Sequence, residues 1–172
     1  MKTPMTTSAS TSTPAAHKTL WAWTVATFFG AGFGRPGPGT WGSVAALLLW
    51  VAFAWGVSSS PGALLVALFA AIALALVLGI PASTIVARES GRHDPGFVVV
   101  DEAIGQWIAL VGSQANWRHA LIALVLFRLF DITKPFPLRR LEKLPEGWGI
   151  VLDDVGAGLY ALGVASLLHL WI

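Results

Sequence analysis

The sequence predicts an all-α fold, a polytopic helical bundle embedded in a membrane. Of its 172 residues, 55% are hydrophobic and 12% are charged, and the mean hydropathy is +0.69. Soluble domains carry about 25% charged residues. The charges also gather between apolar segments, one of which, residues 63–80, has no charge at all. Since a span takes roughly 20 apolar residues, we expect about five to six helices with short cytoplasmic loops.

The N-terminal part divides into three pieces. Residues 1–19 are rich in Thr, Ser, Pro and Ala and predict a disordered cytoplasmic tail, so residues 20–172 would form a single membrane-embedded domain. Residues 20–33 are apolar but short for a span, which favours an interfacial or half-inserted helix. Thr40 or Ser43 is a good N-cap for the next helix, which would end near residue 57.

The rest of the chain alternates between apolar and polar segments. The polar segments contain most of the charges and several prolines, which predicts loops. The predicted helices cover residues 63–80, 98–112, 120–131 and 155–172, and the predicted loops cover residues 81–97 and 134–150.

The charge distribution predicts the orientation. Of eleven Lys and Arg residues, only Arg118 falls in a loop on one side of this layout. Positive charge concentrates in cytoplasmic loops, so the other side should face the cytoplasm. All nine carboxylates fall on that same side or at the helix ends that face it, which indicates one site at the inner membrane face.

Composition excludes several classes of site. The chain has no cysteine, which rules out thiolate metal centres and cysteine nucleophiles. The net charge of +2 is too small to indicate a nucleic-acid partner. Motifs of the cysteine, histidine and aspartyl-phosphate classes of phosphatase are also absent, so phosphoryl chemistry here would be metal-assisted and based on carboxylates.

Acidic residues are the main candidates for function. Carboxylates that are brought together raise one another's pKa unless a cation neutralises them, and hard oxygen ligands favour Mg²⁺. The simpler interpretation is that each acid compensates a helix dipole. These acids are Asp101, Glu102, Asp131, Asp153 and Asp154, with Glu89 nearby.

Two basic residues accompany these acids. Arg128 lies three residues before Asp131 on the same helix face, which suits a structural ion pair as well as a phosphate contact. Lys134 precedes a proline and so leaves helical geometry, which would let it project toward a phosphate. The glycine-rich loop from Arg35 to Thr40 could hold an anion through backbone N–H groups at a helix start, although a tight interhelical turn is the simpler interpretation.

Four motifs occur in the order found in one known family. They are Pro38-Gly-Thr-Trp-Gly-Ser43, Asp94-Pro95 with Val99-Val-Asp-Glu102, Phe127-Arg-Leu-Phe-Asp-Ile-Thr-Lys-Pro135, and Gly149-Ile-Val-Leu-Asp-Asp154 followed by Ala157-Gly158. With them, residues 29–160 resemble the phosphatidylglycerophosphatase A family. The resemblance implies a multi-pass enzyme of the bacterial inner membrane that hydrolyses phosphatidylglycerophosphate to phosphatidylglycerol and inorganic phosphate. It further implies a dependence on Mg²⁺ and an active site at the cytoplasmic face.

The resemblance and the residue chemistry together give a hypothesis for the site. Glu102 or Glu89 would deprotonate a water activated by the metal, or an aspartate would attack phosphorus instead; the sequence leaves both open. The expected metal ligands are Asp101, Asp131, Asp153 and Asp154, the expected catalytic residues are Asp131, Glu102, Asp154 and Glu89, and the expected phosphate-binding residues are Arg128, Lys134, Thr40 and Arg35.

The rival interpretation is not enzymatic. A small cation- or proton-translocating membrane protein could use the same acidic cluster as ion ligands. That class predicts polar residues near the middle of the membrane and an internal repeat. Residues 63–80 contain no charge and the chain shows no repeat, so the sequence favours the lipid phosphatase.

Overall fold

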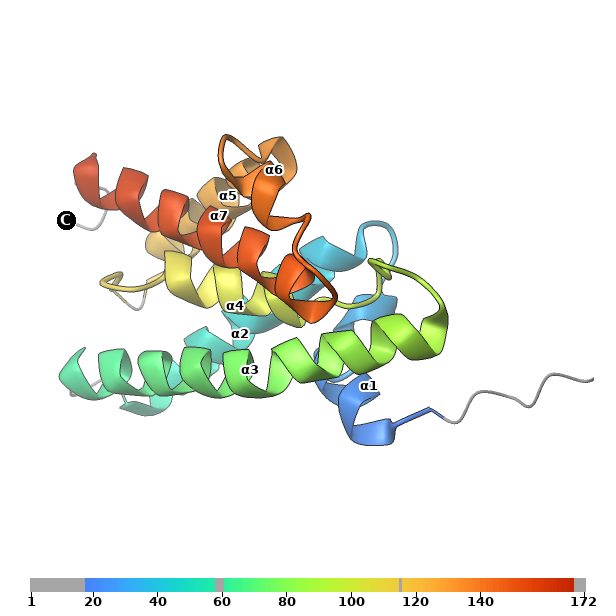
Figure 1. Cartoon of the computed structure of the whole chain (residues 1–172). Coiled ribbons are helices and arrows are strands. Elements are labelled where there is room, and N and C mark those ends of the chain that lie inside the picture. Colours follow the sequence, from blue (N-terminus) through green and yellow to red (C-terminus); the bar gives the residue numbers. More distant parts are fainter. Residues whose placement is uncertain (1–17, 58–60, 115, 169–172) are drawn as a thin grey trace, which may run out of the picture.

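The computed structural model describes residues 18–57, 61–114 and 116–168, and in these ranges the chain is helical with no strand (Figure 1). Residues 1–17 of the predicted tail and the last four residues of the predicted final helix lie outside the described part. The elements are α1 (Leu20–Ala26), the 3-10 helix η1 (Ala31–Phe33), α2 (Pro38–Val57), α3 (Pro61–Ser90), α4 (Val100–Ala109), α5 (Trp117–Thr133), α6 (Leu138–Leu141) and α7 (Gly147–Leu167).

Three helices are long and apolar enough to cross a membrane, over Pro38–Gly56 in α2, Gly62–Ser90 in α3 and Gly147–Leu167 in α7. The outer surface of α3 carries exposed Val66, Leu74 and Val77, a distribution that suits contact with lipid. With 30 residues, α3 is about 45 Å long at 1.5 Å per residue. The structure is thus that of a helical membrane protein, as the sequence predicts.

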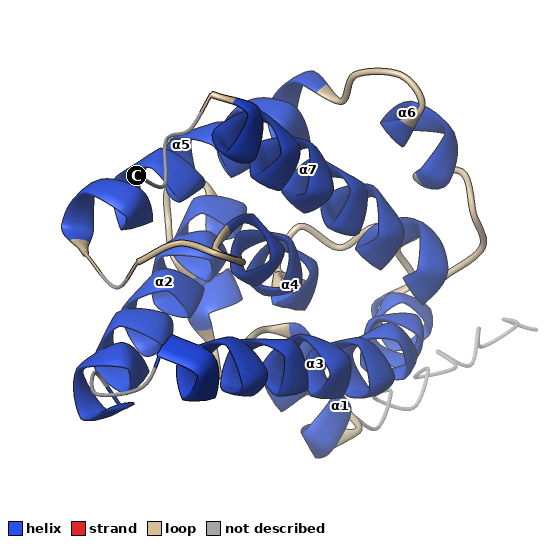
Figure 2. Ribbon diagram, turned by 90° about the vertical axis from the view of Figure 1, so that its left-hand side faces the viewer, coloured by secondary structure: helices blue, strands red, loops and turns tan. Residues whose placement is uncertain are grey.

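Helix α4 lies at the centre of the bundle, with α2, α3, α5 and α7 around it (Figure 2). All of its residues except Glu102 are buried. The helices alternate in direction, so α2, α4 and α7 begin at the end where α3 and α5 finish (Figure 1). One contact at this end is the Gly147 N–H bond to Thr84 Oγ1, 3.1 Å long, which ties the start of α7 to the last third of α3.

The segment predicted as one helix over residues 20–33 is divided. Helix α1 ends at Ala26, Phe28 and Phe29 have positive φ angles of 45° and 56°, and η1 follows. Positive φ is incompatible with a continuing α-helix, so the chain turns sharply here. Whether α1 lies in the membrane interface stays a prediction.

The prediction that residues 81–97 form a loop was wrong for residues 81–90. Helix α3 continues through Pro81 to Ser90. Proline removes one backbone hydrogen bond, and packed membrane helices tolerate that loss. The helix instead ends at Gly91, whose φ is +65°, where the N–H groups of Gly91 and Arg92 bond back to Arg88 and Ala87 in a glycine-type C-cap.

The boundaries after α5 also differ from prediction. The predicted loop over residues 134–150 contains the short helix α6, and α7 begins at Gly147 rather than near residue 155. A glycine is needed at 147 because a Cβ atom there would overlap the Ile80 carbonyl oxygen and approach Thr84. Asp153 and Asp154 therefore lie in the second turn of α7 and not ahead of its first.

Candidate active site

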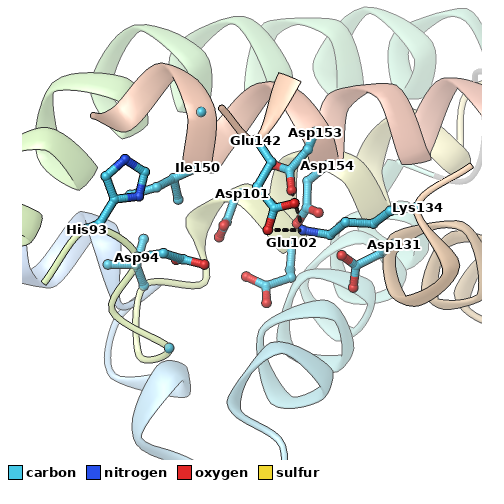
Figure 3. Close-up of a pocket in the computed structure, with 13 residues that line it drawn as sticks. His93, Asp94, Asp101, Glu102, Asp131, Lys134, Glu142, Ile150, Asp153 and Asp154 are labelled. Atoms are coloured by element: carbon cyan, nitrogen blue, oxygen red, sulfur yellow. Dashed lines mark hydrogen bonds and ion pairs between the residues drawn. The ribbon is translucent and has the colours of Figure 1, made fainter. Parts of the chain in front are cut away.

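Five carboxylates converge in one cavity at the end of the bundle where α3 and α5 finish (Figure 3). They come from the first turn of α4, the last turn of α5 and the second turn of α7: Asp101, Glu102, Asp131, Asp153 and Asp154. The cavity, here named the acidic pocket, measures about 160 Å³, several times the ~10–15 Å³ that one water molecule needs. The structure thus gathers the five acids that the sequence assigns to one site.

Two glycines allow α4 and α7 to approach closely enough for this. A Cβ atom on Gly105 would overlap the Phe127 ring and the Asp154 carbonyl oxygen, and one on Gly158 would overlap the Gly105 carbonyl oxygen. Small residues let helix backbones pack tightly in membrane bundles. Because this crossing lies one turn beyond the acids of α4, it brings them next to those of α7.

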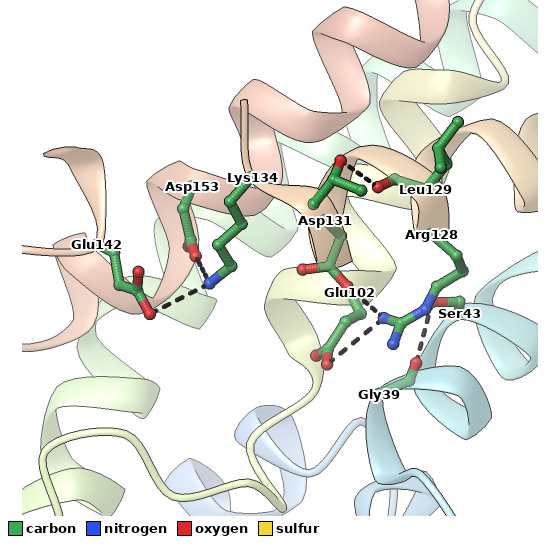
Figure 4. Close-up of polar contacts among 10 residues, drawn as sticks. Gly39, Ser43, Glu102, Arg128, Leu129, Asp131, Lys134, Glu142 and Asp153 are labelled. Atoms are coloured by element: carbon green, nitrogen blue, oxygen red, sulfur yellow. Dashed lines mark hydrogen bonds and ion pairs between the residues drawn. The ribbon is translucent and has the colours of Figure 1, made fainter. Parts of the chain in front are cut away.

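Arg128 links the acids of two helices (Figure 4). Its Nη1 atom lies 2.6 Å from Asp131 Oδ2 on the same helix and 4.0 Å from Glu102 Oε1 on α4. The three side chains are 13–20% exposed, so solvent screens this arrangement less than a surface pair. Gly39, at the start of α2, makes room for it, since a Cβ atom there would overlap Glu102 Oε1 and lie 3.1 Å from Arg128 Nη1.

Lys134 itself lines the acidic pocket. It caps α5 in the left-handed conformation, with φ 42°, and its ammonium donates to Asp153 Oδ2 at 2.6 Å. Glu142 lies 3.3 Å away on the other side (Figure 4). Burial lowers the pKa of Lys134, but Asp153 and Glu142 outweigh this and raise it above its usual value, so the ammonium stays charged.

Burial acts strongly on the two carboxyls of α4, a helix too short to be among the candidate spans. Loss of hydration, together with the neighbouring Glu102 carboxylate, raises the pKa of Asp101 well above its usual range. Burial also raises the pKa of Glu102, although Asp101 and Arg128 act in the opposite direction. In the absence of a cation, both groups hold protons at higher pH than exposed carboxyls do.

The acidic pocket could hold a metal ion. Asp101, Glu102 and Asp154 each offer one oxygen, and these oxygens lie within 4.8 Å of one another. Asp101 Oδ1 and Glu102 Oε2 are buried and accept no hydrogen bond from the described part of the chain, a costly state that a cation would relieve. This trio differs from the expected ligand set in two ways. Asp131 and Asp153 are not part of it, because they form ion pairs with Arg128 and Lys134. Glu102, which was not an expected ligand, is one of the three.

Four residues that the sequence assigned to the site do not line the acidic pocket. Arg128 lies beside it, paired with the lining residue Asp131. The Glu89 carboxylate accepts bonds from Thr19 N–H at 3.0 Å and from Trp23 Nε1 at 2.7 Å, and so it anchors the start of α1. Thr40 is exposed in the first turn of α2. Arg35 lines a neighbouring groove instead.

The structure adds pocket residues that the sequence analysis left out of its site. Glu142 and His93 line the acidic pocket, and Gly39 makes room for Glu102. Asp94, which the sequence analysis gave in the motif Asp94-Pro95, lines the pocket as well. The sequence motif that begins at Pro38 includes Gly39, so it could have pointed to a role for this glycine in the site. Nothing in the local sequence around Glu142 separates it from an ordinary loop acid, because only the fold carries it to Lys134.

Comparisons with known proteins agree with these features. The profile of the family described as Phosphatidylglycerophosphatase A matches residues 24–169. The chain is 40% identical over 146 residues to a Haemophilus influenzae protein named Phosphatidylglycerophosphatase A, covering 84% of this chain and 86% of that one. A protein of the same name from Escherichia coli K12 is 32% identical over 149 residues, covering 83% and 81%.

A third relative carries a different name. A Bacteroides thetaiotaomicron protein, provisionally named as a phosphatidylinositol-3-phosphatase, is 38% identical over 140 residues, covering 80% of this chain and 86% of that one. No solved structure is significantly similar to the chain.

Proposed function

Because the chain belongs to the phosphatidylglycerophosphatase A family, we propose that it hydrolyses the terminal phosphate of phosphatidylglycerophosphate at the cytoplasmic face of a bacterial inner membrane. The products are phosphatidylglycerol and inorganic phosphate. One observation carries this proposal: buried carboxylates meet Lys134 in the acidic pocket, with Arg128 paired to one of these acids beside it, at one end of a bundle with apolar spans. A lipid phosphate monoester lies at that depth, at the membrane surface.

Arg128 and Lys134 bind the phosphate group in this proposal. Lys134 lines the pocket and Arg128 lies beside it, each paired with a pocket acid, and each would exchange part of its present ion pair for phosphate oxygens. Arg128 can engage Asp131 and a phosphate together, since a guanidinium offers five N–H donors. Lys134 supplies a compact point charge. Their charge neutralises the oxygens as the phosphorus–oxygen bond breaks.

Mg²⁺ is the proposed cofactor. Asp101, Glu102 and Asp154 would hold it, because three carboxylates form the hard oxygen set that this ion prefers, and Asp153 lies beside them. When bound, such an ion polarises the phosphate and makes a water molecule more acidic. The unpaired oxygens of Asp101 and Glu102 support this assignment.

Asp131 is the proposed general base. Its carboxylate points into the acidic pocket (Figure 3), and the ion pair with Arg128 holds it in one orientation. It takes a proton from the attacking water as the new phosphorus–oxygen bond forms and the bond to the glycerol oxygen breaks. The departing glycerol oxygen takes a proton from solvent water, and Asp131 then gives its proton back to the solvent. Glu89 has no chemical role in this scheme, since its carboxylate bonds to Thr19 and Trp23.

The test is phosphate release from phosphatidylglycerophosphate by the purified protein in detergent, with Mg²⁺ and then with EDTA. We expect metal-dependent release that falls by roughly 100-fold or more in Asp131→Asn, the scale of general-base catalysis, and that Asp154→Asn abolishes. Glu146→Gln is the matched control, because its exposed carboxylate pairs with Arg88 outside the pocket. Folded wild-type protein that releases no phosphate would refute the proposal and favour ion transport.

The relative named for phosphatidylinositol 3-phosphate adds a second candidate substrate. The same assay with that lipid separates the two activities. We expect the higher kcat/KM with phosphatidylglycerophosphate, in line with the names of the other two relatives. The reverse order would reassign the substrate while leaving the phosphatase chemistry in place.

A further inference from the structure

We propose that a groove beside the acidic pocket binds the phosphodiester of the same lipid whose terminal phosphate is hydrolysed. This arginine groove is lined by Arg35 and Arg92, with Phe33, Gly96 and Phe97 among the residues between them. Its volume is about 570 Å³, within the range of small-molecule sites. The inference rests on the proposed function, because that substrate carries two phosphates.

Two short links hold the arginines at the groove. Arg92 follows the C-cap of α3, where its own N–H bonds to the Ala87 carbonyl at 3.1 Å. Arg35 lies between η1 and α2, next to Gly37 with its φ of +69°. Gly32, in η1 just before Arg35, packs against the segment that follows Arg92, because a Cβ atom on Gly32 would overlap the Phe97 carbonyl oxygen. This contact brings residues that are far apart in the sequence to one groove.

Neither arginine of the groove has a partner within the described part of the chain. The ion pairs found there involve Arg88, Arg128 and Lys134, and none involves Arg35 or Arg92. Two guanidinium groups that share a groove without a carboxylate produce a positive potential, and they suit an anionic phosphate because each can bind it through two N–H bonds.

The groove continues into the acidic pocket. Gly96 lines both cavities, and the link that carries Arg92 into the groove also carries His93 and Asp94 into the pocket. In phosphatidylglycerophosphate a three-carbon glycerol joins the phosphodiester to the terminal phosphate. A lipid that spans both cavities would place its phosphodiester against the arginines and its terminal phosphate against Arg128 and Lys134. The exposed ring of Phe33 and the partly buried ring of Phe97, stacked at 6.0 Å, both line the groove.

A second basic groove adjoins the pocket at Lys134, and its arginines are already engaged. It contains Arg139 and Arg140. The Arg139 Nη2 atom donates to the Thr133 carbonyl at 3.4 Å, and the Arg140 guanidinium lies over the Phe136 ring at 4.7 Å. Partnered guanidinium groups have less to gain from a phosphate, so the groove of Arg35 and Arg92 is the better site for the phosphodiester. The pair Arg139 and Arg140 provides a matched control.

The first experiment measures steady-state kinetics with phosphatidylglycerophosphate in neutral detergent micelles. We expect Arg35→Gln and Arg92→Gln each to raise KM roughly tenfold, the scale of one lost charge-assisted hydrogen bond, with kcat within about twofold. Arg92→Lys should recover part of the loss. The double variant Arg139→Gln with Arg140→Gln should keep the wild-type KM. An unchanged KM in both groove variants, or a larger increase in the control, would overturn the proposal.

The second experiment measures binding without catalysis, by thermophoresis of the purified protein with dihexanoyl phosphatidylglycerol, which has the phosphodiester but no terminal phosphate. Arg35→Gln and Arg92→Gln should raise its Kd roughly tenfold and should leave the Kd of inorganic phosphate unchanged. An equal loss for inorganic phosphate would assign the groove to the free anion and contradict the proposal. Because this readout needs no turnover, it separates failure of the groove from failure of the proposed phosphatase activity.

Discussion

At the scale of single residues, the contact between Arg128, Asp131 and Glu102 shows how one cation can organise two helices. The guanidinium of Arg128 lies against acids of α5 and α4 together, and both acids are mostly buried. A buried charge that loses its partner is costly, so these side chains depend on one another. In the proposed function the same group also binds the substrate phosphate, so its geometry would matter as much as its charge.

We expect Arg128→Lys to lower kcat/KM by roughly 10- to 100-fold, because an ammonium cannot contact both acids and a phosphate in the fork geometry of arginine. The measurement is phosphate release with phosphatidylglycerophosphate. The control is Arg88→Lys, the same substitution in an exposed pair with Glu146, whose side chains are 68% and 43% exposed. Equal activity of both variants would show that only the charge of Arg128 is used.

The raised pKa values of Asp101 and Glu102 predict a pH-dependent metal requirement. Protons and Mg²⁺ compete for the same carboxylate oxygens, and binding of the ion releases protons. As the pH falls through the raised pKa values, the Mg²⁺ concentration for half-maximal activity should increase, by about tenfold per pH unit for each proton displaced. Titrations of Mg²⁺ at a series of falling pH values test this. A constant half-maximal concentration would remove these two acids from the metal site.

At the scale of the elements, the crossing of α4 and α7 determines where the acids meet. Gly105 and Gly158 bring the two backbones together, and α4 is enclosed by its neighbours on every side (Figure 2). A helix that is buried all round cannot shift without disturbing the helices that pack on it. The site therefore depends on residues that touch neither metal nor substrate.

Gly105→Ala should destabilise the protein by about 1–3 kcal/mol, the usual cost of overpacking, and should lower activity because the α4 acids move away from α7. The matched control is Gly163→Ala in α7, where a Cβ atom would meet nothing within 4 Å; alanine there should be neutral or slightly stabilising. Thermal unfolding in detergent and phosphate release give the two readouts. If the two variants behave alike, the close crossing has no part in building the site.

At the scale of the whole molecule, the polar and apolar residues separate along the bundle. The acidic pocket lies at the end where α2, α4 and α7 begin, while Trp117 and Arg118 start α5 at the opposite end. Exposed apolar side chains cover the helices between the two ends. This separation suits an enzyme that stays in the bilayer and works on a headgroup at one surface.

The proposed orientation can be tested directly, because the chain has no cysteine of its own. Single variants Arg88→Cys and Arg118→Cys, both at exposed positions, would be treated in spheroplasts with a membrane-impermeant maleimide. We expect Arg118→Cys to react at once and Arg88→Cys to react only after lysis, since positive loops stay in the cytoplasm. The opposite pattern would place the acidic pocket on the outer face.

The sequence by itself determined the class of the protein and the five acids that the structure brings together. High hydropathy and scarce charge predict a helical membrane protein, and acids that recur at the ends of apolar segments predict one acidic cluster. Both predictions depend only on the amino-acid composition and on the order of residues along the chain. The boundaries of α3 and α7 could not be predicted, because Pro81 is accommodated only by packing and Gly147 is required only by contact with Ile80.

The tertiary structure alone decided which acids lie close enough together to hold one metal ion. Asp101, Glu102 and Asp154 come together because glycines let α4 and α7 cross, whereas Asp131 and Asp153 are drawn to Arg128 and Lys134. It also placed Glu89 with α1 and Arg35 with Arg92. The pair of Arg128 and Asp131 is local, three residues apart, and its spacing predicted it. The other elements that meet here are far apart in the sequence, and their distances depend on helix packing, which no local pattern encodes.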